Sequence, residues 1–317
     1  MTVLTTFLRG CISSLILGLN TALAALPIFF IALLKLLIPV KSWRLTCGIL
    51  LNRIVEFWIC CNETWLPKPA KVVWTNFGPT TLDEHKSCMV TSNHQTWADI
   101  FLVQDLLNQR TPQLKFFLKQ ELIWIPVIGL CWWALDFPFM KRYSKSYLKK
   151  HPEKKGKDQE TTKKACEKFR EIPVAIYNFM EGTRFTPEKQ KRQQSNLKYL
   201  LKPKAGGAGL VLSALGEQIN HLINVTIYYK EDVPGFWDLL CGKNGNAIIH
   251  IEKKEIPGHL LNRDYGSDPE FRTNLLQWIN EIWKDKDELL ATLNEADSKK
   301  EKTADAGLEP VEKNTDV

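Results

Sequence analysis

The chain has 317 residues, of which 44% are hydrophobic and 24% charged, values typical of a globular protein. Its net charge of +7 suits an anionic partner, such as phospholipid headgroups or a phosphorylated substrate. The sequence contains no zinc-finger spacing, basic zipper or aromatic RNA-binding signature, so nucleic acid is not an expected partner. The eight cysteines form no C-x-x-C pair, which indicates reduced thiols and favours a cytosolic face.

The N-terminal segment is strongly apolar and predicts a membrane helix. Residues 11–34 carry no charge, and a helix of that length extends about 36 Å, enough to cross a hydrocarbon core of about 30 Å. The stretch Ala22–Ala24 resembles a signal-peptide cleavage site, but the apolar run continues well past it, so we expect an uncleaved anchor. Three cations follow the segment and one precedes it, so the positive-inside rule places the rest of the protein in the cytoplasm.

A second apolar segment, residues 45–61, differs from the first because it contains polar side chains, among them Arg53 and Glu56. These two residues lie three positions apart and can pair on the surface of a helix. This pattern favours a helix that lies in the membrane interface or packs on the first helix, rather than a second span. We therefore assign residues 1–40 to a transmembrane anchor and residues 41–70 to an interfacial amphipathic segment.

Beyond residue 70, short apolar runs alternate with helical ones, which predicts an α/β domain over residues 71–295 with functional groups in the loops at strand ends. The expected strands are residues 88–92, 172–179, 222–229 and 246–256, and the expected helices are 97–107 and 208–215. A long C-terminal helix should begin at a capping box formed by Ser267 and Glu270. Residues 296–317 are polar and aperiodic, and we expect a disordered tail there.

One apolar stretch within this domain, residues 122–140, has two open interpretations. Proline, glycine and Asp136 interrupt it, as expected of a segment in the core of the domain. It could instead form the wall of a lipid-facing groove, with Trp124, Trp132 and Trp133 near the level of the headgroups.

His94 and Asp99 form the first candidate site. On one continuous helix their side chains would diverge by about 140°. If the strand 88–92 ends at the histidine, His94 lies on a loop and Asp99 lies in the first turn of the next helix, where free amides stabilise its carboxylate. Asp99 can then fix the tautomer of His94, which acts as a general base toward a hydroxyl group of the substrate. The alternative is a structural histidine near the start of a helix.

Two further segments suggest an anion site. In E-G-T-R, after the second predicted strand, Gly182 allows backbone N–H groups to face an anion, and Arg184 offers a planar fork for phosphate. Glu181 could position the arginine or accept a hydrogen bond from the acceptor hydroxyl. Arg142, next to Lys141, is another candidate phosphate ligand. The alternatives are a surface turn with a solvated ion pair and a basic pair that flanks the membrane.

Taken in order, these segments resemble a known family. "NHQTWAD", "KQELIWIPVIG", "FPFMKR" and "FMEGTR" are similar to the N-H-x4-D, K-x-E-L-x-x-x-P-x-x-G, F-x-x-R-like and E-G-T-R motifs of the 1-acylglycerol-3-phosphate acyltransferases, or lysophosphatidic acid acyltransferases. The resemblance covers residues 85–230. It extends through "FWDLLCGK" in a bacterial inner-membrane subgroup with an N-terminal hydrophobic anchor.

The resemblance implies a glycerolipid-acyltransferase-like α/β fold, with a mixed sheet flanked by helices. It also implies transfer of a fatty acyl group from acyl-CoA or acyl carrier protein to lysophosphatidic acid, giving phosphatidic acid, on the cytoplasmic side of a bacterial inner membrane. It assigns catalysis to His94 and Asp99, and an oxyanion or acyl-donor role to Lys119. The phosphate ligands that it implies are Arg142, Glu181, Gly182, Thr183 and Arg184. No metal or redox cofactor is implied, since the acyl thioester is a co-substrate.

Two departures leave the substrate open. The family's fourth motif is an apolar V-P-V strand, whereas Ile223–Tyr229 reads "INVTIYY", which leaves the acyl-chain preference undetermined. The second motif reads P-F-M-K-R rather than I-F-I-D-R, which adds Lys141. Another lysophospholipid, such as lysocardiolipin, could be the acceptor, and a non-catalytic lipid-binding protein would also keep the apolar and basic surfaces. A hydrolase is disfavoured because the sequence has no G-x-S-x-G nucleophile elbow.

Overall fold

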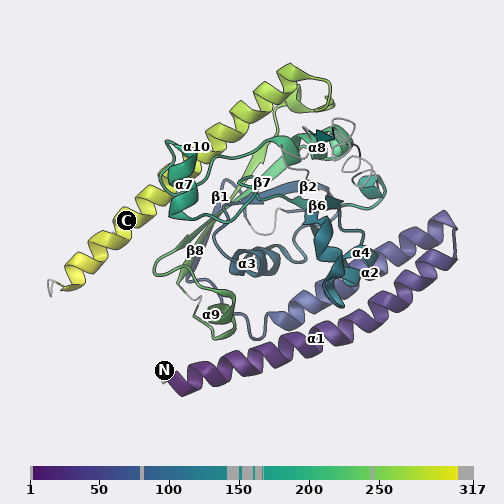
Figure 1. Ribbon diagram of the computed structural model, residues 1–317, viewed down its shortest axis with the longest axis horizontal. Helices are drawn as coiled ribbons and strands as arrows, with labels where there is room; N and C mark the ends of the chain where they lie inside the picture. The colour runs from purple at the N-terminus through teal and green to yellow at the C-terminus, as the bar shows by residue number, and fades with distance from the viewer. Residues whose placement is uncertain are drawn as a thin grey trace, which may run out of the picture.

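The computed structural model describes residues 3–78, 82–140, 150–151, 160, 166, 168–243 and 246–305. Its centre is a six-stranded sheet with helices on both faces (Figure 1). The strands, in spatial order, are β1 (Lys71–Thr75), β8 (Ala247–Glu255), β7 (His221–Tyr229), β2 (Cys88–Ser92), β6 (Ala175–Tyr177) and β3 (Leu114–Phe116). All neighbours are parallel except β7 and β8, which are antiparallel. The predicted mixed α/β sheet is confirmed.

The helices divide between the two faces. One face is covered by α1 (Val3–Leu37), α2 (Lys41–Asn62), α3 (Ala98–Leu107) and α4 (Ile128–Ala134), and the other by α8 (Gly206–Leu215) and α10 (Pro269–Asp305). The shorter elements are β4 (Leu118–Lys119), η2 (Gln120–Trp124), β5 (Phe139–Met140), η4 (Lys168–Arg170), α7 (Pro187–Gln193), α9 (Phe236–Leu240) and η5 (Gly258–Leu260).

Strand β7 shows why the sheet needs two helical layers. All nine of its residues are buried. Ile223, Val225 and Ile227 contribute to the core beneath α3, whereas Leu222 and Tyr228 contribute to the core beneath α8 and α10. Successive side chains of a strand point to opposite faces, so a strand that is apolar on both sides must be covered on both.

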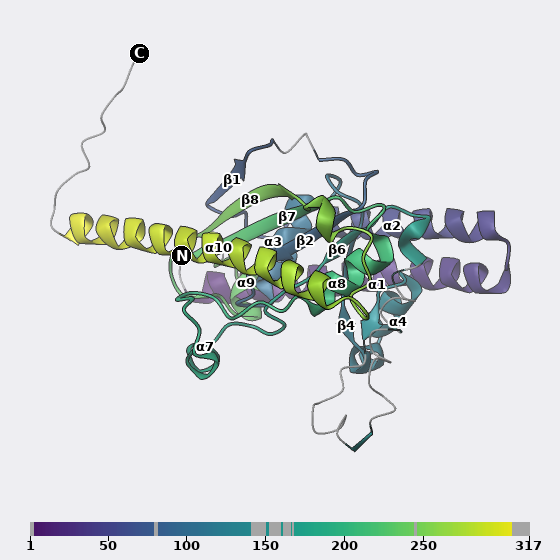
Figure 2. The same ribbon diagram turned by 90° about the horizontal axis from the view of Figure 1, so that it is seen from above.

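Helices α1 and α2 lie side by side as a hairpin along one edge of the domain (Figures 1 and 2). Asn20 of α1 donates through Nδ2 to Trp58 O at 2.9 Å and to Asn62 Oδ1 at 3.0 Å, both on α2. The expectation that the second segment packs on the first is therefore confirmed. Both helices are long and apolar enough to cross a membrane by length and composition alone.

The C-terminal helix corrects two expectations. Its cap is Asp268, whose Oδ1 accepts the N–H of Phe271 at 2.9 Å, while Ser267 donates its hydroxyl to Asp264 instead. Asp268 lies directly before the first helical residue, so its carboxylate takes the capping position predicted for Ser267. The helix also continues through residues 296–305, which we expected to be disordered, because lysine, glutamate and alanine there favour helix. Residues 306–317 lie outside the described part of the chain.

Candidate active site

An apolar cavity of about 590 Å³ lies beside the carboxyl ends of β2 and β6. These strands are parallel neighbours, so the loops that follow them leave the same edge of the sheet, where α/β folds place ligand sites. Further walls come from α1, α2, α3 and α4. Among the predicted site residues, the cavity is lined by His94, Lys119, Gly182, Thr183 and Arg184.

The structure brings His94 and Asp99 together in the way that their spacing requires. His94 lies on the loop after β2, Asp99 lies in the first turn of α3, and His94 Nδ1 is 3.0 Å from Asp99 Oδ2. The same oxygen accepts the N–H groups of Gln95 at 2.6 Å and Thr96 at 2.9 Å. An ionised carboxylate can only accept, so Nδ1 carries the proton and Nε2 is left to accept one. This is the arrangement of a general base and its orienting carboxylate.

A tyrosine that sequence reasoning missed holds the other oxygen of Asp99. Tyr229, at the end of β7, donates its hydroxyl to Asp99 Oδ1 at 2.7 Å. Burial and the charge of Asp99 raise the pKa of Tyr229 well above its usual value, so the hydroxyl remains a donor. The Asp99 carboxylate is fully buried and accepts hydrogen bonds on both oxygens, as a buried charge requires. The His94 ring stacks on Phe179, with ring centroids 3.8 Å apart, which fixes the plane of the imidazole.

Glu181 lies inside the protein and does not line the cavity. Its side chain is fully buried, and its two oxygens accept the N–H groups of His94 at 3.2 Å and Leu201 at 3.1 Å. Burial raises the pKa of Glu181 to about 8, an effect that the positive charge of Lys286 on α10 opposes. Burial also lowers the pKa of Lys286 to about 7, and its ammonium donates to Val225 O at 2.6 Å. The expectation that Glu181 contacts the substrate is corrected, since Glu181 holds the backbone of His94.

The rest of E-G-T-R faces the cavity. Gly182 has a φ of 71°, which side chains rarely allow, and its N–H donates to Phe179 O at 2.9 Å. That N–H is therefore used within the turn and does not point at an anion, contrary to our expectation. Thr183 and Arg184 line the cavity. A further cation, Lys189 of α7, donates to Thr183 Oγ1 at 2.9 Å and to Arg184 O at 2.8 Å.

Two contacts join the histidine loop to the arginine loop. The Arg184 guanidinium lies over the ring of Trp97, 5.6 Å from its centroid. The N–H of Phe185 donates to the carbonyl oxygen of His94 at 2.7 Å. A base and a cation that come from distant parts of the sequence therefore share one wall of the cavity.

Lys119 is the remaining cation among the predicted residues that the structure describes in the cavity wall. It ends β4, and in the pairing of β4 with β5 it lies opposite Met140. Lys141 and Arg142 follow Met140 directly and lie outside the described residues. Their predicted contact with phosphate therefore remains a prediction.

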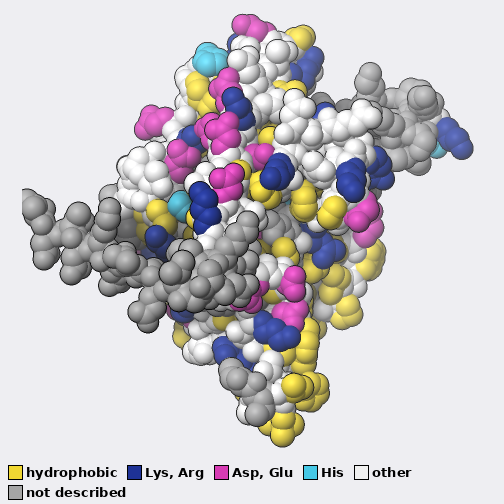
Figure 3. Space-filling view, turned by 90° about the vertical axis from the view of Figure 1, so that its left-hand side faces the viewer, with side chains coloured by type: hydrophobic (Ala, Val, Ile, Leu, Met, Phe, Trp, Pro, Cys, Tyr) yellow, Lys and Arg dark blue, Asp and Glu magenta, His cyan; other side chains and the backbone are white. Residues whose placement is uncertain are grey.

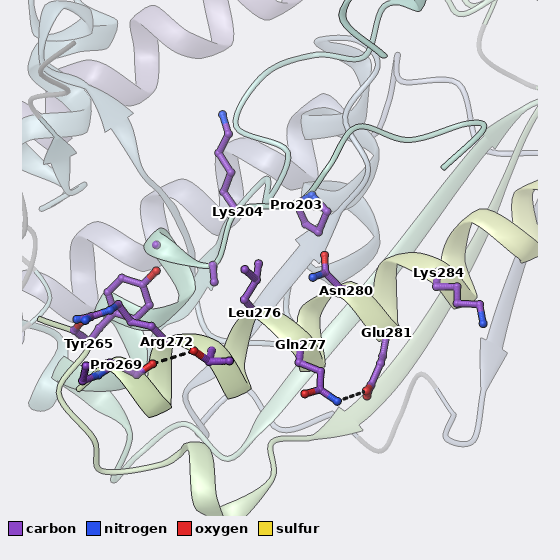
Figure 4. A pocket seen from close by; sticks show the side chains of 13 residues that line it. Pro203, Lys204, Tyr265, Pro269, Arg272, Leu276, Gln277, Asn280, Glu281 and Lys284 are labelled. Carbon is purple, nitrogen blue, oxygen red and sulfur yellow. Dashed lines mark hydrogen bonds between the residues drawn. The ribbon is translucent and has the colours of Figure 1, made fainter. Parts of the chain in front are cut away.

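A second, open groove of about 940 Å³ lies on the opposite face of the sheet, between α10 and the segment before α8 (Figure 4). Its lining includes Lys204, Tyr265, Arg272 and Leu276 and none of the predicted site residues. The Arg272 guanidinium is engaged locally, because it donates to Tyr265 O at 3.0 Å and to Gly266 O at 2.9 Å. We therefore assign the functional site to the cavity that contains His94. Among the described residues, no group of three or more His, Cys, Asp or Glu is placed to hold a metal ion.

Comparison with known proteins agrees with this choice. Residues 75–230 match the family model described as acyltransferase, a range that contains His94, Asp99 and E-G-T-R. The 1-acyl-sn-glycerol-3-phosphate acyltransferase gamma of Mus musculus is 25% identical over 250 residues, which cover 74% of this chain and 59% of the relative. The gamma protein of Homo sapiens is 24% identical over 305 residues, with 89% and 73% covered. The delta protein of Mus musculus is 24% identical over 237 residues, with 68% and 57% covered.

The chain thus spans a little under three fifths of the length of the two mouse relatives. A solved structure, that of the 1-acyl-sn-glycerophosphate acyltransferase PlsC from Thermotoga maritima, aligns with a TM-score of 0.47 at 17% identity, over 90% of this chain and 97% of that chain. The curated relatives named here are mammalian, so the bacterial subgroup remains a prediction.

Proposed function

Because the chain belongs to the acyltransferase family, we propose that it transfers a fatty acyl group from a thioester to the free hydroxyl of lysophosphatidic acid, giving phosphatidic acid. The observation that carries the proposal is the His94–Asp99 pair in the wall of an apolar cavity that also contains Arg184. The pair supplies a base for a hydroxyl, the apolar walls suit an acyl chain, and the cation suits a phosphate.

The chemistry needs no nucleophile from the protein. His94 Nε2 takes the proton of the acceptor hydroxyl as its oxygen attacks the thioester carbon, and Asp99 stabilises the imidazolium that forms. The carbon–sulfur bond then breaks, and the imidazolium returns the proton to the departing thiolate. An ester and a free thiol are produced, and His94 is neutral again. Lys119 lines the same cavity and is our candidate for stabilising the charge on the thioester oxygen.

The acceptor phosphate is assigned to the loop after β6. Arg184 offers the planar fork that suits phosphate oxygens, and the Thr183 hydroxyl is a neutral partner beside it. Lys189 holds both residues through Thr183 Oγ1 and Arg184 O, and adds a positive charge next to them. Arg142, outside the described residues, is proposed as a second phosphate ligand on the ground of the sequence resemblance.

The surface of α1 supports a membrane location and indicates how the helix lies. Exposed apolar side chains recur every three or four residues from Leu8 to Leu37, among them Ile12, Leu15, Leu19, Leu23, Leu26 and Phe30. The opposite side packs on the domain. At one end, a Cβ on Gly10 would lie 2.7 Å from Cys241 Sγ, and at the other Lys35 pairs with Asp136.

The contacts of α1 with the domain favour a helix that lies in the plane of the membrane. From Gly10 to Lys35 they extend over about 38 Å of the helix. Helix α9 packs on α1, so an α1 that crossed the bilayer would carry the Asp238–Lys243 ion pair beside α9 toward the hydrocarbon. We therefore propose that α1 lies in the plane of one leaflet with its apolar stripe toward the lipid, in place of the transmembrane anchor that its length suggested. Figure 3, which shows the left-hand side of the view in Figure 1, has hydrophobic side chains gathered at its lower end and most of the charged ones higher up. The cytoplasmic leaflet of a bacterial inner membrane remains the predicted location.

The direct test is acyl transfer by the purified protein in detergent, with labelled oleoyl-CoA or oleoyl-acyl carrier protein as donor and a panel of lysophospholipids as acceptors. We expect lysophosphatidic acid to be acylated. Transfer only to another lysolipid, such as lysocardiolipin, would correct the acceptor and keep the reaction class. Absence of transfer with every donor and acceptor would favour a non-catalytic lipid-binding protein.

Replacing His94 tests the mechanism. We expect His94→Ala to lower turnover at least about 100-fold, the low end of the contribution of a general base. A circular dichroism spectrum and a melting temperature like those of the parent protein would show that the variant is folded. Near-normal turnover in that folded variant would remove His94 from this role.

A further inference from the structure

The segment between β4 and β5 exposes an unusual amount of apolar surface. We define the apolar ridge as the exposed side chains of residues 124–133, which are Trp124, Ile125, Val127, Ile128, Leu130 and Trp133. Trp124 is 85% exposed, and the leucine and the second tryptophan are each more than half exposed. Residues 122–135 contain no charged side chain. An apolar patch of this kind on a folded domain marks a contact surface.

The ridge is built on closely packed backbone. A Cβ on Gly129 would lie 2.2 Å from the carbonyl oxygen of Ile123, so η2 and the start of α4 approach as closely as only glycine allows. Ile128 N donates to Pro126 O at 2.7 Å, which closes a three-residue turn at Val127. Val127 has a φ of 63°, a strained value for a β-branched residue. The side chain of Val127 is 45% exposed, so burial of that side chain does not account for the strain.

The inner side of the same segment forms part of the active-site cavity. Leu122, Cys131, Trp132 and Leu135 line it, as does Ile128 of the ridge, together with residues of α1. Helix α4 also contacts α1 directly. The ridge is therefore the outer surface of a wall whose inner surface faces the substrate, and it adjoins the helix that we place in the membrane.

We propose that the apolar ridge is a second membrane contact, which inserts into the interface of the leaflet that holds α1 and marks the side from which lipids reach the cavity. The inference rests on the membrane location given under the proposed function. The direct contact of α4 with α1, the helix that we place in the membrane, favours a lipid surface as the occupant over a second protein. The two exposed tryptophans suit the headgroup level, because their rings combine an apolar body with a polar N–H.

A fluorescence measurement tests this contact in the full-length protein. Trp124→Cys is made in a background in which Cys11, Cys60 and Cys61, the cysteines that are not buried, are changed to serine. The new thiol is labelled with an environment-sensitive fluorophore, and the protein is reconstituted in vesicles of phosphatidylcholine and phosphatidylglycerol. We expect blue-shifted emission that brominated acyl chains quench and iodide does not. A matched label at Asn280→Cys, in the groove of Figure 4, should show the reverse.

Two results would overturn the proposal. If iodide quenches the label at position 124 as strongly as the label at position 280, the ridge faces water. If neither iodide nor brominated lipid quenches it, another copy of the chain covers the ridge, which a doubled mass in light scattering would confirm. Either result can occur in a protein that still acylates lysophosphatidic acid, so failure of the ridge and failure of the proposed function are distinguishable.

An activity measurement provides a second test. Leu130 is exposed and does not line the cavity, so Leu130→Asp should fold and keep its activity toward substrates in mixed micelles. With lysolipid embedded in vesicles, we expect its rate to fall about tenfold, because a charge replaces an apolar contact with lipid. Leu130→Met, which keeps the apolar surface, should match the parent protein in both assays. Equal loss for Leu130→Asp in micelles and vesicles, or no loss in either, would contradict the proposal.

Discussion

Removing the hydroxyl of Tyr229 would test whether its hydrogen bond to Asp99 contributes to catalysis by His94. Tyr229→Phe deletes the donor to Asp99 Oδ1 and leaves the two backbone donors to Oδ2 in place. A hydrogen bond to a charged group contributes about 1.5–3 kcal/mol. Because Gln95 and Thr96 still hold the carboxylate, we expect the lower end of that range, equivalent to a kcat about tenfold lower. KM for both substrates should not change, since the tyrosine hydroxyl bonds to Asp99 and not to substrate.

Rates expressed per mole of folded protein separate this role from general damage to the fold. Thermal melting gives the folded fraction at the assay temperature, and the lower kcat of Tyr229→Phe should remain after that correction. The matched control is Tyr228→Phe, because the hydroxyl of Tyr228 faces the other layer and donates to Asp297 at 3.3 Å. If both variants leave kcat unchanged, the reasoning about Asp99 is wrong.

Two other predictions concern the core and the cavity. Lys286→Met removes the buried amine that donates to Val225 O and should destabilise the fold by about 1–3 kcal/mol, whereas exposed Lys284→Met should not. Burial lowers the pKa of Lys286 to about 7 from its usual 10.5, so the parent protein gains stability as pH rises above 7 and the amine loses its charge. The variant lacks this gain, so its melting-temperature deficit should be larger at pH 8.5 than at pH 5.5, and a constant deficit would contradict this. Ala25→Phe places a ring in the α1 wall of the cavity. It should lower kcat/KM for oleoyl relative to octanoyl thioesters at least about tenfold, equivalent to the lost burial of roughly two methylenes, whereas exposed Ala22→Phe should not. If the oleoyl-to-octanoyl ratio is the same in both variants and the parent protein, α1 is not part of the wall that binds the acyl chain.

The parts of the fold that could be predicted are those whose pattern is local. Strand β2 was predicted at its observed bounds, because it is a short apolar run followed by a helix. Strands β1 and β3 were missed. β1 is only partly buried and β3 has three residues, so neither shows a distinct alternation. The strand predicted at residues 172–179 is ordered as a strand only over Ala175–Tyr177, since its partners β2 and β3 pair with those residues alone.

In the candidate site, too, the residues that could be predicted are those that a local pattern places. The loop position of His94 and the helical position of Asp99 followed from their spacing and the strand before them. The roles of Tyr229 and Lys286 could not be predicted, because each meets its partner only through tertiary packing across more than a hundred residues. Glu181 was misassigned for a related reason. A carboxylate next to glycine and arginine suggests a polar surface, and only the fold shows that it points inward.

The shared wall between α1 and the cavity limits how this protein can vary. A membrane anchor that is only a tether can be exchanged for another anchor or removed without changing the chemistry. Here Leu17, Thr21 and Ile28 of the N-terminal helix line the substrate cavity while the other side of the helix faces outward. A deletion designed to give a soluble enzyme would open the cavity to water, and an unrelated replacement helix would reshape it. Adaptation to a new lipid environment and a change in substrate selectivity therefore depend on one stretch of sequence.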